Sequence, residues 1–423
     1  MKLYTTARPW LNALVAPALG LLCFAASSCE KEPFDNHYTV QDASGFTILG
    51  LPNAGLAAKY APGETAPVII GYNANESPKD ITVFQVINKQ DSAVVGTYPA
   101  NGQFLQSAQL TTQAVPYVVP ANLANKTPVR VDVTLTFANG SKRMRRFTYT
   151  VASSPTLKFG ATPATYRNGL AGTAQSTGDI IGYSVIINEG GISTLPAPAA
   201  TPNATLFKAV DSLAYYYREG TQAPIRLGVV RNPTAGAANT RTVDIVVPAA
   251  ASGKTINFVF VAYAQSTSAT VTSAPIAIGG TTALATTRTG RVSFGPNSAP
   301  DSLAFNLKTG LNEPAANPVT AKDLFVSGVS GNTLVLSAAN GTRYYKVPAA
   351  QVANGFYTKA TANDVGTLIY QNTTAADLGA VAVNDVYAVK VRGTGETMLI
   401  RIVGTKNSTG GSTGRVRFEY RSL

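Results

Sequence analysis

The sequence has few of the side chains that most enzymes use for catalysis and metal binding. Its 423 residues include two cysteines, one histidine and one tryptophan, and charged residues make up only 13%. A Ser-His-Asp site, a Cys-His site or a histidine-bound metal would all depend on His37 alone. Cys23 and Cys29 both lie near the N-terminus, so no disulfide framework can hold the fold together. We therefore predict no catalytic residues, no metal site, no cofactor and no enzymatic activity.

Carboxylates are the one remaining route to catalysis. A glycosidase needs two acids across a cleft, and Asp211 and Glu219 are acids that could serve. The chain has only 22 acidic residues, and no pattern brings two of them together. Solvated surface acids are the better interpretation, and a carboxylate-dependent, glycan-acting enzyme is kept as an alternative.

The composition favours β-structure. Apolar residues make up 45% of the chain, which also contains 37 glycines and 25 prolines, a mixture typical of strands joined by tight turns. The formal net charge of +12 is spread thinly along a chain that we expect to be exported, so nucleic acid is not an expected partner.

The first 28 residues have the three parts of a signal peptide. Lys2 and Arg8 precede an apolar run from 11 to 26, and small residues follow up to Cys29. The apolar run is about 16 residues long, which is short for a membrane span of roughly 20. We predict a leader at 1–28 and a polar tether at 29–38.

The junction at the end of the leader resembles a bacterial lipobox. It reads Ala26-Ser27-Ser28-Cys29, with Ala26 where the motif usually has leucine. The resemblance implies that Cys29 is lipidated and becomes the first residue of the mature protein. The following Glu30-Lys31-Glu32 resembles a surface-export signal of lipoproteins of the Bacteroidota. It implies a lipid-anchored protein of the cell envelope, at the outer membrane and with exposure at the surface.

Two segments of the chain match in order. The matches predict two tandem Ig-like β-sandwich domains, at 39–153 and 154–281, because duplications of this length indicate tandem domains. The matched pairs are Ile69-Ile70-Gly71-Tyr72 with Ile180-Ile181-Gly182-Tyr183, Asp91-Ser92 with Asp211-Ser212, and Val118-Val119-Pro120-Ala121 with Val246-Val247-Pro248-Ala249.

Residues 282–423 are expected to form a third, β-rich domain, which makes the predicted fold all-β. Alternation predicts strands at 302–307, 334–336, 343–347, 367–370, 386–391, 398–403 and 415–420, with helical turns at 360–364 and 375–378. The runs F-N-L-K-T-G at 305–310 and D-V-Y-A-V-K-V-R-G at 385–393 resemble the C-terminal module of many Bacteroidota lipoproteins. That resemblance implies no particular activity.

A tyrosine run is the candidate ligand contact. Tyr215, Tyr216 and Tyr217 precede Arg218, and an exposed tyrosine beside an arginine could stack on a sugar or pair with an acid. Because consecutive strand residues face opposite sides, at least one of the three tyrosines is expected in the core.

Cations alternate with apolar residues in the last strands. If these strands are neighbours, the cations share one sheet face, which fits either an anionic partner or a solvated outer face with protected edges. The cations are Lys390, Arg392, Arg401, Arg415, Arg417 and Arg421.

Three Asp-Ser-apolar motifs resemble the O-glycosylation sequon of the Bacteroidota. They imply modification at Ser92, Ser212 and Ser302, although Asp-Ser also suits a turn before a strand.

Together these features predict a lipid-anchored envelope protein with a non-catalytic display, adhesion or ligand-binding role. Its expected partners are the membrane, through the N-terminal lipid, and a polysaccharide or an envelope protein. A glycan-binding accessory subunit of an outer-membrane nutrient-uptake system is the main alternative.

Overall fold

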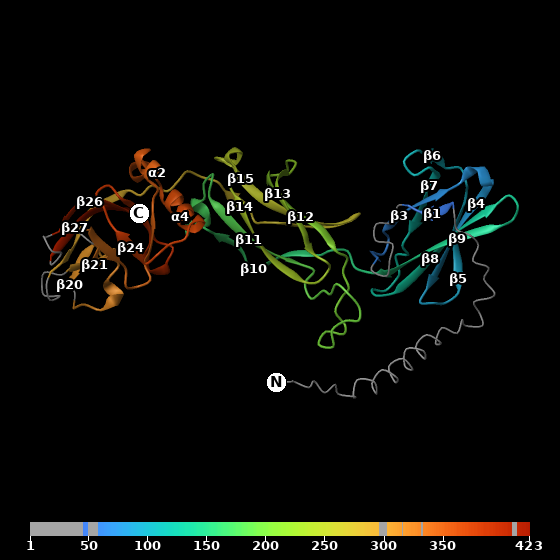
Figure 1. Cartoon of the computed structure of the whole chain (residues 1–423), viewed down its shortest axis with the longest axis horizontal. Coiled ribbons are helices and arrows are strands. Elements are labelled where there is room, and N and C mark those ends of the chain that lie inside the picture. The colour runs from blue at the N-terminus through green and yellow to red at the C-terminus, as the bar shows by residue number, and fades with distance from the viewer. Residues whose placement is uncertain (1–44, 50–57, 296–302, 315, 331–332, 408–412) are drawn as a thin grey trace, which may run out of the picture. The chain divides into compact units, whose positions relative to one another are not determined.

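The computed structural model describes residues 45–49, 58–295, 303–314, 316–330, 333–407 and 413–423 (Figure 1). Cys29, the leader, the tether and Ser302 lie outside these residues. Contacts divide the chain into one unit of Met1–Gly55, Ala66–Tyr117 and Val129–Thr148, and another of Leu56–Thr65, Val118–Pro128 and Tyr149–Leu423. The described strands form six sheets, which confirms the predicted all-β fold.

Two sheets hold the strands between residues 46 and 151. Their strand orders are β1-β3-β7-β6 and β2-β9-β8-β4-β5. The strands are β1 Phe46–Ile48, β2 Lys59–Tyr60, β3 Thr65–Tyr72, β4 Pro78–Ile87, β5 Ser92–Pro99, β6 Gln103–Leu105, β7 Leu110–Val118, β8 Pro128–Phe137 and β9 Lys142–Val151. Alternation along β8 buries Val131, Val133 and Leu135 completely, as the sequence predicts. In the first unit, the Tyr117 ring packs edge-on against Phe147 with ring centres 6.1 Å apart.

The same strand order recurs between residues 157 and 277. Here β10-β11-β14 corresponds to β1-β3-β7, and β16-β15-β12-β13 corresponds to β9-β8-β4-β5. The strands are β10 Leu157–Tyr166, β11 Ile180–Ile187, β12 Val210–Glu219, β13 Ile225–Thr234, β14 Asn239–Val246, β15 Thr255–Ala264, β16 Thr267–Thr272 and β17 Ile276–Ala277. We call this pair of sheets the second sandwich.

The matched sequence motifs fall at two kinds of position in this repeat. Val119-Pro120 follows β7 and Val247-Pro248 follows β14, so these two motifs occupy corresponding places. Asp91-Ser92 lies at the start of β5, whereas Asp211-Ser212 lies in β12, which corresponds to β4. The two Asp-Ser motifs are therefore not equivalent, because a short motif that suits any strand start can recur by chance.

The C-terminal region, from residue 282, contains a seven-stranded sheet and a three-stranded sheet. Their orders are β20-β19-β18-β27-β26-β25-β23 and β21-β22-β24. The strands are β18 Thr286–Phe294, β19 Leu303–Asn306, β20 Leu311–Pro314, β21 Phe325–Ser330, β22 Thr333–Ser337, β23 Arg343–Lys346, β24 Asp377–Ala380, β25 Val386–Lys390, β26 Thr397–Asn407 and β27 Gly414–Ser422. One face of the large sheet packs on the small sheet, through residues such as Phe418, Ile400 and Leu336.

Short helices cover part of the other face of the large sheet. They are α2 Ala349–Ala353, α3 Phe356–Lys359 and α4 Ala362–Gln371, and Val365 and Ile369 of α4 pack against Val386 and Leu399. Among the described residues, no helix has both the length and the apolar character needed to cross a bilayer.

Two of the predicted elements were wrong. Residues 367–370 belong to helix α4 rather than to a strand, because Thr361 and Asp364 form a capping box that starts a helix at Ala362. The predicted helical turn at 375–378 instead leads into strand β24, which pairs with β22.

Two lysines, the half-buried Lys59 and the buried Lys208, join the segment 58–65 to the second sandwich within the second unit. Lys59 donates from Nζ to the carbonyl oxygens of Ser193, Phe207 and Ala235 at 2.7, 3.0 and 3.0 Å. Glu64 and Lys208 form an ion pair of 2.5 Å in which both side chains are 2% exposed. Removing either partner of such a pair lowers the stability of the fold, because the remaining charge would be buried without a counter-charge.

The C-terminal region is joined to the second sandwich by polar contacts around helix α4. Tyr370 donates its hydroxyl to Asp244, 2.5 Å away, and its ring lies 4.9 Å from the guanidinium carbon of Arg167. Arg167 in turn binds Asp244 at 2.8 Å. Gly366 lies against Asn168, where a Cβ atom would come within 2.3 Å of the Asn168 carbonyl oxygen. Glycine is required at this helical position by close packing.

Replacing Lys208 with methionine should lower the free energy of unfolding by about 3–5 kcal/mol, because Glu64 would remain buried without a counter-charge. The double variant Glu64→Gln/Lys208→Met should recover most of this loss. The matched control is Lys254→Met, which removes a half-exposed pair with Glu219 (side chains 44% and 39% exposed) and should cost less than about 1 kcal/mol. Urea unfolding measures all three, and equal losses for the Lys208 and Lys254 variants would contradict the expectation.

Candidate functional site

Strand alternation separates the predicted tyrosine run into two groups. Tyr215 and Tyr217 face the core of the second sandwich, where Tyr217 is 6% exposed and the Tyr215 ring packs near Phe260. Tyr216 and Arg218 lie on the opposite, outer face of β12 and are half-buried. Only these two of the four predicted contacts remain available to a surface ligand.

Tyr216 has a partner that the sequence did not indicate. Tyr263 lies on the outer face of β15, is 38% exposed, and places its hydroxyl oxygen 3.4 Å from that of Tyr216. The hydrogen bond to Tyr263 raises the pKa of Tyr216, and partial burial adds to this effect. The two tyrosines therefore place aromatic side chains with neighbouring hydroxyl groups on the outer face of this sheet.

The predicted O-glycosylation sites differ in accessibility. Ser92 is exposed at the start of the edge strand β5. Ser212 is half-buried in the middle strand β12, opposite Tyr263 on β15 and Arg231 on β13. A glycan on Ser212 would therefore lie beside the Tyr216–Tyr263 surface.

Strands β25, β26 and β27, which carry five of the six predicted cations, are neighbours. Arg392 instead lies in a short 3-10 turn, Val391–Gly393, that follows β25. Three of the six cations nevertheless bind carboxylates or carbonyl oxygens of the protein itself. Arg392 binds Asp323 at 2.6 Å, and Arg401 binds Glu419 at 2.6 Å while its guanidinium lies over the Tyr357 ring. Arg421 donates to backbone carbonyl oxygens, including that of Leu284 at 2.9 Å.

The part of this face that the helices leave uncovered carries four exposed cations. Arg291 lies directly opposite Arg417, and Lys406 lies directly opposite Arg415. Within the described part of the chain, none of the four is in an ion pair. Like charges in directly opposed positions repel, so this arrangement is not explained by stability.

The buried acids are fully used by structural contacts. Among the described residues, four acids are buried: Glu64, Asp132, Asp179 and Asp323. Asp323 has no exposed surface and accepts from Arg392, Thr342, Asn340 and the Leu307 backbone N–H, at 2.6–2.9 Å. A carboxylate surrounded by donors in this way has no free lone pair for proton transfer.

The two acids named as catalytic candidates lie at opposite ends of one strand. Asp211 and Glu219 are eight residues apart in β12, which corresponds to roughly 26 Å of extended chain. Asp211 accepts from the Gln265 backbone N–H at 2.6 Å, and Glu219 pairs with Lys254 at 3.0 Å. They cannot share a cleft. The described residues contain no group of three or more His, Cys, Asp or Glu side chains that could hold a metal ion.

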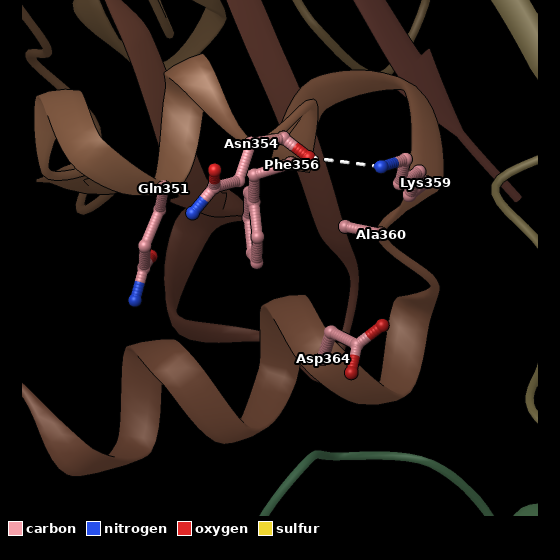
Figure 2. A pocket seen from close by; sticks show the side chains of 6 residues that line it. All are labelled: Gln351, Asn354, Phe356, Lys359, Ala360 and Asp364. Atoms are coloured by element: carbon pink, nitrogen blue, oxygen red, sulfur yellow. Dashed lines mark hydrogen bonds between the residues drawn. The ribbon is translucent and has the colours of Figure 1, made fainter.

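A surface cavity of about 310 Å³ lies among the helices of the C-terminal region (Figure 2). Figure 2 shows Asn354 and Phe356 on one side and Asp364 of helix α4 on the other. Its charged groups serve the local fold, because Lys359 donates to the Asn354 carbonyl oxygen at 3.1 Å and Asp364 caps α4 through Thr361. Both charged side chains of this cavity therefore take part in local hydrogen bonds.

Comparison with family models finds no match, and comparison with curated proteins finds none. Among solved structures, the chain is similar to a DUF4466 family protein from Parabacteroides merdae, with 13% identity, a TM-score of 0.24, and coverage of 64% of this chain and 100% of that one. It is also similar to dimeric latent PorU from Porphyromonas gingivalis, with 10% identity, a TM-score of 0.20, and coverage of 56% of this chain and 20% of that one. Scores this low carry no argument about function.

Replacing Arg417 with glutamate should raise the free energy of unfolding by about 0.2–1 kcal/mol, because a repulsive pair with Arg291 becomes an attractive one. Added salt should reduce the gain. Arg288→Glu is the matched control: it makes the same charge change on an exposed residue that faces Tyr420 rather than a cation. Thermal unfolding at low and high salt measures the difference, and an equal effect in the two variants would show that net charge alone is responsible.

Proposed function

We propose that this protein is a lipid-anchored component of the cell envelope in which two Ig-like sandwiches and a C-terminal β-rich domain present a non-catalytic binding surface. The recurring strand order supports the Ig-like assignment, since each copy combines a sheet of the β1-β3-β7 type with one of the β9-β8-β4-β5 type. The leader and Cys29 supply the anchor, at the outer membrane and facing the outside.

The Tyr216–Tyr263 surface is the observation that carries the binding role. Aromatic rings with an accessible face stack on sugar rings, and hydroxyl groups at their rims bind sugar hydroxyls. Tyr263 is 38% exposed, and Arg218 lies two residues from Tyr216 on the same face. This combination favours a glycan as ligand, and with it the role of a glycan-binding accessory subunit in an outer-membrane nutrient-uptake system.

The engagement of the buried acids favours binding over catalysis. Glu64, Asp132, Asp179 and Asp323 each accept bonds from the protein itself, and the pair Asp211 and Glu219 is too widely separated to act jointly. A carboxylate-dependent enzyme would need two acids about 5–10 Å apart across a cleft. For this reason the enzymatic alternative is not proposed further.

Replacing Tyr216 or Tyr263 with alanine should weaken binding to any glycan that the wild-type protein recognises by about tenfold, which corresponds to roughly 1.4 kcal/mol. A glycan array followed by titration of the strongest hit measures this. Tyr98→Ala is the matched control, because Tyr98 is a half-exposed tyrosine on a strand outside the second sandwich. If the wild type recognises no glycan, or if all three variants bind alike, the glycan role fails and display or adhesion to a protein remains.

Replacing Cys29 with serine should abolish acylation and release the protein from membranes, because acyl chains supply the attachment. Labelled fatty acid and membrane fractionation measure the two effects. Cys23→Ser is the control, since Cys23 lies within the predicted leader and its loss should leave acylation intact. A wild-type protein that takes up no label, together with a Cys29 variant that stays with membranes, would contradict the lipid anchor.

A further inference from the structure

A second cavity, of about 280 Å³, lies within the second unit where the second sandwich meets the C-terminal region. Its walls come from the turn after β10 (residues 167–169), from helix α4 with the segment that follows (366–374), and from the ends of β25 and β26 with their connecting loop (390–397). The volume suits one sugar ring or a metabolite of similar size, since drug-sized ligands occupy about 300–1,000 Å³.

Lys390 brings an unneutralised charge to this cavity. It is half-buried at the end of β25, and no carboxylate of the described residues pairs with it. Its cross-strand neighbours are Arg343 on β23, which adds positive charge, and Thr397 on β26. The other cation in the wall, Arg167, is paired with Asp244. Lys390 is therefore the cation of this wall that has no carboxylate partner among the described residues.

Thr397 adds a polar group without a partner. The residue lines the cavity, is 4% exposed, and its hydroxyl makes no hydrogen bond within the protein. Most buried hydroxyls are satisfied, and an exception calls for an explanation. Because Thr397 lies directly opposite Lys390, rotation about its χ1 angle would direct the hydroxyl to the same occupant as the ammonium group.

Glycines let the main-chain segments that form the cavity wall pack closely against one another. A Cβ atom on Gly169 would lie 3.0 Å from the carbonyl oxygen of Gly395, and one on Gly366 would collide with the Asn168 backbone. The wall at these points is main chain, which offers polar groups rather than apolar side chains that could fill the space. Tyr370 lines the same cavity with its aromatic ring.

We infer that this cavity binds an oxyanion, a carboxylate or a phosphate carried on a sugar-sized ligand, with Lys390 as the counter-charge and Thr397 as a hydrogen-bonding group. Acidic sugars and sugar phosphates both have this chemistry. The cavity shares no residue with the Tyr216–Tyr263 surface, so the inference does not rest on the glycan role proposed for that surface and the two can fail separately.

Ligand-observed NMR titration of the soluble Cys29→Ser protein tests the site with three probes: glucuronate, glucose 1-phosphate and neutral glucose. One or both anions should bind at millimolar concentrations, and glucose should bind far more weakly. Lys390→Gln should weaken anion binding by about tenfold or more, as expected for loss of a charge-assisted hydrogen bond. Lys406→Gln removes an exposed cation elsewhere on the same sheet and should leave binding unchanged.

Thr397→Val separates ligand binding from a structural role. Valine has nearly the same shape and lacks a hydroxyl that bonds to nothing in the protein, so the variant should keep its melting temperature while binding the anion several times more weakly. Binding of glucuronate alone identifies a sugar acid as the ligand class, and binding of glucose 1-phosphate alone identifies a phosphate. The inference is overturned if neither anion binds, if glucose binds equally well, or if Lys390→Gln and Lys406→Gln have the same effect.

Discussion

Alternation along β-strands is the constraint from which the positions of the candidate surfaces follow. A strand presents successive side chains to opposite faces, so every residue of β12 or β27 belongs either to the core or to the outside. Tyr217 is thereby assigned to packing, while its neighbour Tyr216 is left outside with Tyr263. The same rule puts Phe418 in the core and Arg417 in the exposed group of cations.

Some charged side chains of this protein form buried ion pairs that stabilise the fold, whereas other charged side chains form no ion pair within the described residues. Glu64 pairs with Lys208 and Asp323 pairs with Arg392, and the loss of Lys208 or Arg392 would leave a buried carboxylate without its counter-charge. The exposed cations Arg415 and Arg417, and Lys390 in its cavity, have no such role. These cations make the surface locally positive, and a positive surface attracts anions from solution.

Sequence patterns predicted the elements formed by local alternation and did less well where distant residues meet. The strand over Val131 and Val133 and the split of the tyrosine run both follow from period two, and both are present in the structure. The bond between Arg392 and Asp323 spans 69 residues, and the bond between Tyr216 and Tyr263 spans 47, so neither leaves a local pattern. The helical turn predicted at 360–364 overlaps the start of α4, but the rest of the helix was predicted as a strand because a four-residue apolar stretch at 367–370 suits either structure.

The contact between Gly366 and Asn168 has a consequence for tracing relatives of this chain. Glycine inside a helix costs about 1 kcal/mol relative to alanine, so drift would remove it wherever it were not needed. Here any larger residue would push helix α4 away from the turn at Asn168 and disrupt the packing between the second sandwich and the C-terminal region. A distant sequence that keeps glycine at this place in the helix, with an arginine and a tyrosine where Arg167 and Tyr370 stand, would preserve the same joint even where overall identity has faded.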